Sequence, residues 1–131
     1  MKKIKLKSFK KKSGKLIPIN FDKTFPIKVK RFFYIYGKKN QYRGNHAHKK
    51  CTQIFIPIFG KIKLNLISKY KEINFKLNHK KNYGVVVPPK IWIKLHFLQK
   101  DSIVLVICDK KYEYKDYIGT YKKYLNFIKK K

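Results

Sequence analysis

Apolar and polar residues alternate along most of the chain, which is the pattern of β-strands with one buried face. The clearest example is residues 61–67, in which lysine or asparagine at every second position separates isoleucine and leucine. Similar stretches recur along the sequence, at residues 4–7, 16–19, 27–36, 45–48, 53–58, 61–67, 72–77, 85–87, 91–97 and 103–108. About ten short strands with this punctuation predict an all-β fold, either a sandwich, a barrel or a jelly roll.

Turn-forming residues separate these predicted strands, and the end of the chain follows a different pattern. Gly14, Gly60 and Gly84 each border an apolar run. From Asp116 onward, tyrosine, leucine and isoleucine recur at helical spacing, and lysines follow. This spacing predicts a short C-terminal helix over residues 116–129, with Asp116 as its N-cap, that seals one end of the barrel. No linker or repeat interrupts the pattern, so we expect one domain over residues 1–131.

Composition favours a globular protein with free thiols. The chain has 131 residues, of which 44% are hydrophobic and 16% aromatic, which suffices for a buried core. Cys51 and Cys108 are too few for a disulfide framework and lack C-x-x-C spacing, so we read both as small apolar side chains in a reducing compartment. Since no run of 18 apolar residues and no signal peptide is present, we expect a cytoplasmic protein that does not span a membrane.

The formal net charge of +29 changes this picture less than its size suggests. Only Arg31 and Arg43 are arginine, whereas proteins that bind nucleic-acid phosphates rely heavily on the planar guanidinium. The lysines are spread over the whole chain at alternating positions, as on solvated strand faces. We therefore expect no specific nucleic-acid partner, although a basic module that stacks bases on aromatic side chains stays an alternative. An anionic small substrate would experience a favourable field.

One short segment, residues 43–53, carries the candidate chemistry. His46 and His48 are two residues apart, so on a strand both imidazoles project from the same face and form either a metal site or an acid/base site. The spacing resembles the first metal-binding motif of cupins, but Gln53 stands where a carboxylate would supply charge. The stretch that corresponds to the second cupin motif, residues 88–93, contains no histidine. We therefore expect no metal.

Without a metal, the two histidines are suited to proton transfer. Imidazole titrates near neutral pH and can take a proton from a carbon beside a carbonyl. Arg43 can stabilise the negative charge that develops on the oxygen. A tyrosine of the preceding strand, Tyr34 or Tyr36, can donate a hydrogen bond to that oxygen, and Gln53 can fix the tautomer of a histidine. These groups are what isomerisation through an enolate or enediol requires.

Several segments resemble one enzyme family. The aromatic run at residues 32–36, the segment Arg-Gly-x-His-Ala-His-Lys at residues 43–49, and Gln53 are similar to the dTDP-4-keto-6-deoxyglucose 3,4-ketoisomerases, which are small metal-independent cupins of about this length. The resemblance runs from about residue 16 to residue 127 and includes further segments at residues 84–92, 102–106, 112 and 116–118. Tyr42 and Gly119 depart from it, because the family often has an acidic residue and an arginine there.

The resemblance implies a fold, a reaction and an assembly. The fold is a cupin-type jelly roll. The reaction moves the keto group of a dTDP-linked 4-keto-6-deoxy sugar from C4 to C3 without a cofactor, ahead of amination for surface glycans such as lipopolysaccharide. The assembly is a homodimer with exchanged strands. A 3,5-epimerase on the same scaffold stays a second possibility, because it needs the same proton abstraction.

The resemblance also implies roles for individual residues. By position, His48 is the principal base that removes the C3 proton, and His46 assists at the C4 side. Tyr34 and Arg43 orient the sugar and stabilise the enediolate. Four further side chains are expected to contact the substrate or line its pocket: Arg31, Tyr36, Gln53 and Trp92.

Overall fold

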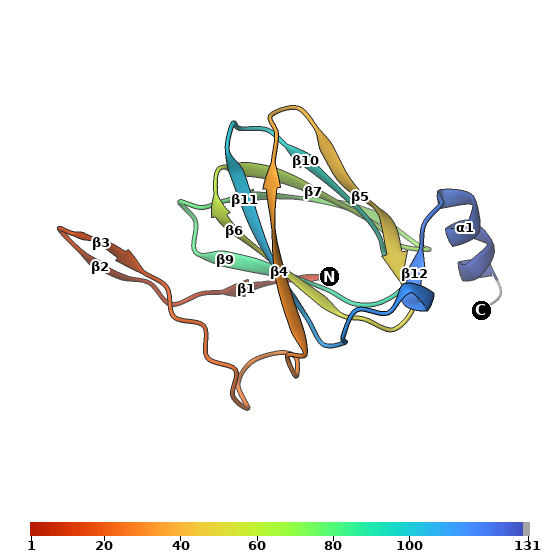
Figure 1. The fold of residues 1–131 in the computed structure, drawn as a ribbon, viewed down its shortest axis with the longest axis horizontal. Coiled ribbons are helices and arrows are strands. Elements are labelled where there is room, and N and C mark those ends of the chain that lie inside the picture. The colour runs from red at the N-terminus through yellow and green to blue at the C-terminus, as the bar shows by residue number, and fades with distance from the viewer. Residues whose placement is uncertain (130–131) are drawn as a thin grey trace.

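Two five-stranded antiparallel sheets face each other in the computed structural model, which describes residues 1–129 (Figure 1). The first sheet has the strand order β1 (Lys2–Lys5), β9 (Tyr83–Val87), β6 (Gln53–Phe59), β11 (Ser102–Cys108), β4 (Arg31–Gly37). The second sheet has the order β12 (Tyr117–Ile118), β5 (Tyr42–His48), β10 (Trp92–Phe97), β7 (Lys61–Ile67), β8 (Glu72–Asn78). A hairpin of β2 (Phe9–Lys11) and β3 (Gly14–Leu16) projects away from both sheets. The predicted all-β fold is confirmed.

The alternating pattern builds the core between the two sheets. In β7, Ile62, Leu64 and Leu66 point inward and are fully buried, while Lys61 and Lys63 face solvent. Inward-facing side chains of β6, β9, β10 and β11 complete the same cluster. Burying each such aliphatic side chain contributes about 1.5–3 kcal/mol to the free energy of folding. The inward-facing residues of the alternating pattern are therefore a main source of stability.

After β1 has extended the first sheet, the segment at residues 17–30 covers the outer face of that sheet. The sequence predicted strands at residues 16–19 and 27–36, but residues 17–30 are irregular, and β4 begins only at Arg31. Pro18 and Pro26 lack the N–H that a strand ladder needs. Apolar side chains of this segment pack on Ile54, Ile56 and Ile107 of the sheet and form a second cluster.

The C-terminal helix is shorter than predicted. Helix α1 spans Tyr121–Lys129, whereas Asp116 ends a short 3₁₀ turn, η1 (Tyr114–Asp116), before β12. The helix is capped by Thr120, whose hydroxyl accepts a hydrogen bond from the Lys123 N–H at 3.2 Å. Among residues 1–129, no helix is long and apolar enough to cross a membrane.

The helix packs on the outer face of the second sheet instead of sealing the end of the barrel, because its contacts Ala47 and Trp92 alternate with side chains that point between the sheets. Tyr124 is fully buried in a cluster with Ala47, Trp92 and Ile118. Its hydroxyl lies 3.0 Å from the carbonyl oxygen of Ile67 and 2.8 Å from that of Lys90. One phenol therefore joins the helix to the end of β7 and to the loop before β10.

Candidate active site

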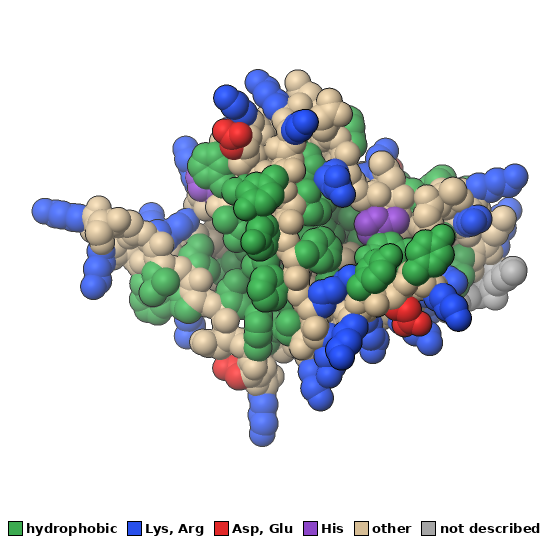
Figure 2. All heavy atoms as spheres, viewed as in Figure 1, with side chains coloured by type: hydrophobic (Ala, Val, Ile, Leu, Met, Phe, Trp, Pro, Cys, Tyr) green, Lys and Arg blue, Asp and Glu red, His purple; other side chains and the backbone are tan. Residues whose placement is uncertain are grey.

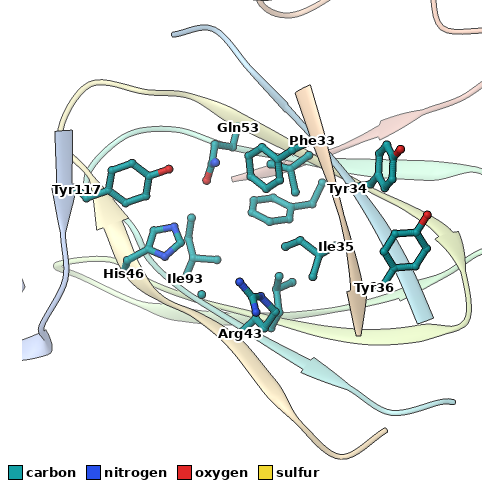
Figure 3. A pocket seen from close by; sticks show the side chains of 13 residues that line it. Phe33, Tyr34, Ile35, Tyr36, Arg43, His46, Gln53, Ile93 and Tyr117 are labelled. Atoms are coloured by element: carbon teal, nitrogen blue, oxygen red, sulfur yellow. The ribbon is translucent and has the colours of Figure 1, made fainter. Parts of the chain in front are cut away.

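An open cavity of about 560 Å³ lies between the two sheets (Figure 3). Its opening lies where β4, the edge strand of the first sheet, faces β5 of the second. The walls are mixed: Phe33, Ile35 and Phe55 form an apolar side, while Arg43 and His46 provide polar groups. A cavity of this size, with a few convergent polar groups, is typical of a small-molecule site.

Strand β5 carries both histidines, and their rings lie together as the i, i+2 spacing predicts. The ring centroids of His46 and His48 are 5.1 Å apart in an edge-to-face arrangement. Just before them, Gly44 and Asn45 have φ angles of 91° and 54°, and the pairing with β10 changes register between Ile93 and Lys94. This bulge bends β5 beside the cavity and sets the direction of the His46 side chain.

A carboxylate orients His48. Nδ1 of His48 lies 2.8 Å from Oδ2 of Asp116, and Oδ1 of Asp116 accepts a hydrogen bond from the Lys50 N–H at 2.7 Å. Asp116 reaches this position because β12, which follows it directly, pairs with the end of β5. With Nδ1–H donated to the carboxylate, Nε2 carries the lone pair. That nitrogen is buried and has no hydrogen-bond partner within residues 1–129.

Burial keeps both imidazoles neutral. It lowers the pKa of His46, and the neighbouring His48 lowers it further. Burial also lowers the pKa of His48, although the hydrogen bond to Asp116 opposes part of this shift. Burial acts to raise the pKa of Asp116, but the hydrogen bonds from His48 and Lys50 outweigh it and hold this pKa below its ordinary value. At neutral pH the pair is therefore a neutral imidazole beside a carboxylate, which is a proton acceptor.

Tyr117 is a site residue that the sequence analysis did not single out. Its ring centroid lies 4.3 Å from that of His48 and 5.2 Å from that of His46, and its side chain lines the cavity (Figure 3). Burial raises the pKa of its phenol, against the effect of a hydrogen bond from Arg31, so the phenol stays protonated. The only feature of the sequence that could have indicated a role for Tyr117 in the site was its position directly after Asp116.

The two histidines differ in their access to the cavity. His46 lines the cavity, whereas His48 is 2% exposed and lies beneath the Tyr117 ring. Arg43 lines the cavity as expected (Figure 3). His46 and Arg43 are therefore open to a molecule in the cavity, whereas Nε2 of His48 is buried.

Gln53 lines the cavity but does not orient a histidine. Its side chain comes from β6 on the opposite sheet, and Nε2 lies 3.5 Å from Sγ of Cys108. Its Oε1 is buried without a hydrogen-bond partner in the described part of the chain. The prediction that Gln53 orients a histidine is wrong, because Asp116 orients His48.

Tyr34 and Tyr36 do not face the histidines within one chain. Inward and outward residues alternate along β4, so Phe33 and Ile35 point into the barrel, and both tyrosines point outward. Figure 3 shows them beyond β4, at the rim of the cavity. The expected hydrogen bond from Tyr34 to the reacting oxygen is therefore not available from the same chain.

Trp92 and Arg31 also lie away from the cavity walls. Trp92 is 5% exposed and packs against Tyr121 and Tyr124 under the helix, so the prediction that it lines the pocket is wrong. The Arg31 guanidinium contacts Cys108 and lies over the ring of Tyr112. Its contacts among the described residues are therefore with other side chains of the protein. Arg31 does not line the cavity, where it was expected to bind the diphosphate of the substrate.

The geometry around His48 fits a proton better than a metal ion. His48, Cys51 and Asp116 are the one group of three potential ligands among residues 1–129, with ligand atoms within 4.8 Å of one another. Two ligands of a tetrahedral zinc ion lie about 3.3–3.5 Å apart, whereas Nδ1 of His48 and Oδ2 of Asp116 are only 2.8 Å apart. This shorter distance is that of a charge-assisted hydrogen bond.

Known proteins are similar in sequence over most of the chain. The family FdtA (WxcM-like, C-terminal) matches residues 1–129. The TDP-4-oxo-6-deoxy-alpha-D-glucose-3,4-oxoisomerase of Aneurinibacillus thermoaerophilus is 29% identical over 118 residues, which cover 89% of this chain and 84% of that protein.

Two solved structures are similar over nearly the whole chain. One is a histidine-to-asparagine mutant of the 3,4-ketoisomerase QdtA from Thermoanaerobacterium thermosaccharolyticum in complex with TDP-4-keto-6-deoxyglucose. It has a TM-score of 0.91 and 30% identity, and the match covers 99% of this chain and 94% of that one. The other is the TDP-fucose-3,4-ketoisomerase WlaRA from Campylobacter jejuni, with a TM-score of 0.84, 29% identity and coverage of 96% and 93%. The fold is thus the cupin-type jelly roll, and the chain belongs to the FdtA family of WxcM-like C-terminal domains.

Proposed function

We propose that this protein is a nucleotide-sugar 3,4-ketoisomerase that acts on TDP-4-keto-6-deoxyglucose. The observation that carries the proposal is the His48–Asp116 pair, whose free Nε2 lies beside an open cavity with an arginine in its wall. The similarity to the oxoisomerase and to the substrate-bound QdtA mutant supports the same substrate.

The reaction needs a proton to leave C3 and another to arrive at C4. Nε2 of neutral His48 accepts the C3 proton, and Asp116 stabilises the imidazolium that forms. The electron pair moves into a C3–C4 enediolate, and Arg43 stabilises the negative charge on its oxygen. The proton of the C3 hydroxyl moves to the C4 oxygen, and protonation of C4 then gives the product with a keto group at C3 and a hydroxyl at C4. His46, which lines the cavity, assists at the C4 side or binds the oxygen.

Replacement of His48 tests this assignment. In His48→Asn, we expect exchange of solvent deuterium into sugar C3 to be lost, because asparagine cannot accept the proton. NMR of TDP-4-keto-6-deoxyglucose incubated in D₂O with the enzyme measures the exchange. His96→Asn is the matched control, since His96 stacks on Tyr42 outside the cavity. Full exchange in His48→Asn would contradict the role given to His48.

The same spectra separate isomerisation from epimerisation. A ketoisomerase moves the keto carbon from C4 to C3, whereas a 3,5-epimerase leaves it at C4 and inverts the neighbouring centres. Both activities begin with abstraction of a proton beside the carbonyl, so the loss of exchange alone does not distinguish them. We expect the shifted keto group.

We also propose that two copies associate through the outer face of the first sheet. Phe32, Tyr34 and Tyr36 project from this face and are 58%, 55% and 71% exposed. Figure 2 shows a column of hydrophobic side chains along β4. Exposed aromatic residues in a row are typical of an interface. A homodimer with exchanged strands and a cytoplasmic location are the further expectations, the latter because both cysteines are free.

A further inference from the structure

Two buried thiols lie beside the cavity, and the proposed reaction uses neither. Cys108 ends β11 with no exposed surface, and Cys51 lies in the loop between β5 and β6 with 2% of its surface exposed. Cys51 and Cys108 belong to one buried cluster, and contact between the two side chains shifts the pKa of both thiols. The pairing of β6 with β11 causes this contact, because Gln53 lies directly opposite Cys108 and Cys51 is two residues earlier.

The surroundings of Cys108 are those of an anion. Nη2 of Arg31 lies 3.7 Å and Nε2 of Gln53 3.5 Å from its sulfur, so both side chains direct N–H groups at it. A cysteine that serves only as a small apolar side chain needs no such donors. The one ion pair among residues 1–129 is that of His48 with Asp116. Cys108 is therefore the group that can balance the half-buried charge of Arg31.

The two thiols consequently differ in character. Contact with Cys51 and the hydrogen bonds from Gln53 and Arg31 lower the pKa of Cys108 to about 6 against the opposing effect of burial. The same contact and burial raise the pKa of Cys51. The N–H donors of Arg31 and Gln53 favour the thiolate of Cys108, and Cys51 is the neighbouring thiol that keeps its proton, which are the roles of a reactive and a resolving cysteine.

We propose that Cys108 and Cys51 form a peroxide-sensitive dithiol that switches the active site off when oxidised. The Cys108 thiolate attacks one oxygen of hydrogen peroxide, the O–O bond breaks, and hydroxide leaves, giving a sulfenic acid. Cys51 then loses its proton and attacks the Cys108 sulfur. The S–O bond breaks, water leaves and the disulfide forms. Hydrogen peroxide is the oxidant and is reduced to two waters overall.

Disulfide formation acts on the site through Gln53 and Arg31. The disulfide sulfur has no negative charge, so it loses most of its strength as an acceptor for both donors. Gln53 lines the cavity, and Arg31 is hydrogen-bonded to Tyr117, whose ring covers His48. We therefore expect oxidation to lower ketoisomerase activity by roughly 10–100-fold. This activity readout rests on the proposed function, whereas disulfide formation does not.

The test treats the protein with hydrogen peroxide and follows both mass and activity. We expect the intact mass to fall by two hydrogens, both thiols to become resistant to alkylation after unfolding, and dithiothreitol to restore both thiols and activity. In Cys51→Ala, oxidation should stop at the sulfenic acid, which dimedone traps on Cys108. In Cys108→Ala, peroxide should leave Cys51 alkylatable.

Three outcomes would overturn the proposal. They are thiols that both stay alkylatable after peroxide, a disulfide that joins two chains instead of Cys51 to Cys108, and an equal rate of oxidation at Cys51 in Cys108→Ala. If the disulfide forms but no ketoisomerase activity is found even in the reduced protein, the proposed function fails and the dithiol stands.

Discussion

The carboxylate of Asp116 determines what His48 can do as a base. It accepts the Nδ1 proton and thereby leaves Nε2 as the basic nitrogen, and it partly offsets the lowering of the imidazole pKa by burial. Without this partner, the ring can adopt the other tautomer and rotate away from the cavity. Asp116 is thus a positioning residue that acts through His48.

Replacement of Asp116 should separate orientation from folding. We expect Asp116→Asn to lower kcat by about 10²–10⁴-fold, because the amide can stabilise the wrong tautomer. The pKa of His48 is below its ordinary value in the wild type, so kcat/KM should fall only below about pH 6.5. In Asp116→Asn this acidic limb should move to still lower pH, because the group that raises the pKa is gone.

The pH profile of kcat/KM and the thermal melting curve of the variant provide these measurements. Asp101→Asn is a suitable control, since Asp101 lies in an exposed turn before β11 and is not among the groups that shift the pKa of His48. A limb that stays in place while kcat falls would show that Asp116 acts only on the structure.

At the scale of elements, helix α1 is held to the barrel by very few polar contacts. Its buried Tyr124 hydroxyl lies between two backbone carbonyls that belong to different parts of the second sheet. A buried carbonyl that loses its donor costs about 1–3 kcal/mol. The Tyr124 hydroxyl therefore makes a large contribution to the free energy of unfolding for a single group on a short helix.

Removing that hydroxyl should destabilise the protein without changing its shape. We expect Tyr124→Phe to lower the free energy of unfolding by about 1–3 kcal/mol, measured by urea denaturation. Tyr121→Phe is the matched control, because Tyr121 is 42% exposed and contacts Trp92 only through its ring. Equal losses in the two variants would contradict the argument.

The elements also show what the sequence could predict. Strands with a strict period of two, such as β7, were found at their observed limits because burial of one face determines both the pattern and the structure. The strand predictions within residues 17–30 were wrong because the apolar side chains of this segment cover a sheet from outside. A covering segment has the same composition as a strand. The partner of His48 could not be found, because it lies 68 residues further along the chain.

The orientation of Tyr34 shows a second limit. Residues 32–36 are aromatic or apolar at every position, so the pattern does not say which face is buried. The pairing of β4 with β11 decides it, and that pairing is a property of the whole sheet.

At the scale of the whole molecule, a row of exposed aromatic side chains runs along β4. Phe32, Tyr34 and Tyr36 lie on one face of an edge strand, and the rings of the two tyrosines contact each other at 5.7 Å. Solvent exposure of three large rings in a row is unfavourable for an isolated chain. A second copy of the same face would bury them, as a two-fold interface allows.

A charge placed in this row should break the proposed dimer. We expect Phe32→Glu to raise the dimer dissociation constant by roughly 30-fold or more, since a buried aromatic anchor commonly contributes about 2 kcal/mol or more. Sedimentation equilibrium over a range of concentrations measures the shift. Tyr70→Glu, at a turn that is 86% exposed, should leave it unchanged. Unaltered association of Phe32→Glu would exclude this face as the interface.

The pairing of His48 with Asp116 has a consequence for protein synthesis. The two residues are separated by 68 positions, and every strand from β6 to β11 lies between them. At about 5–20 residues per second, the ribosome needs on the order of 3–14 s to add this stretch. During that time the growing chain already contains its base but not the carboxylate that orients it. Catalysis therefore begins only after nearly all of the barrel has been made, and a chain interrupted before residue 116 would be an inactive enzyme even if its strands had begun to pair.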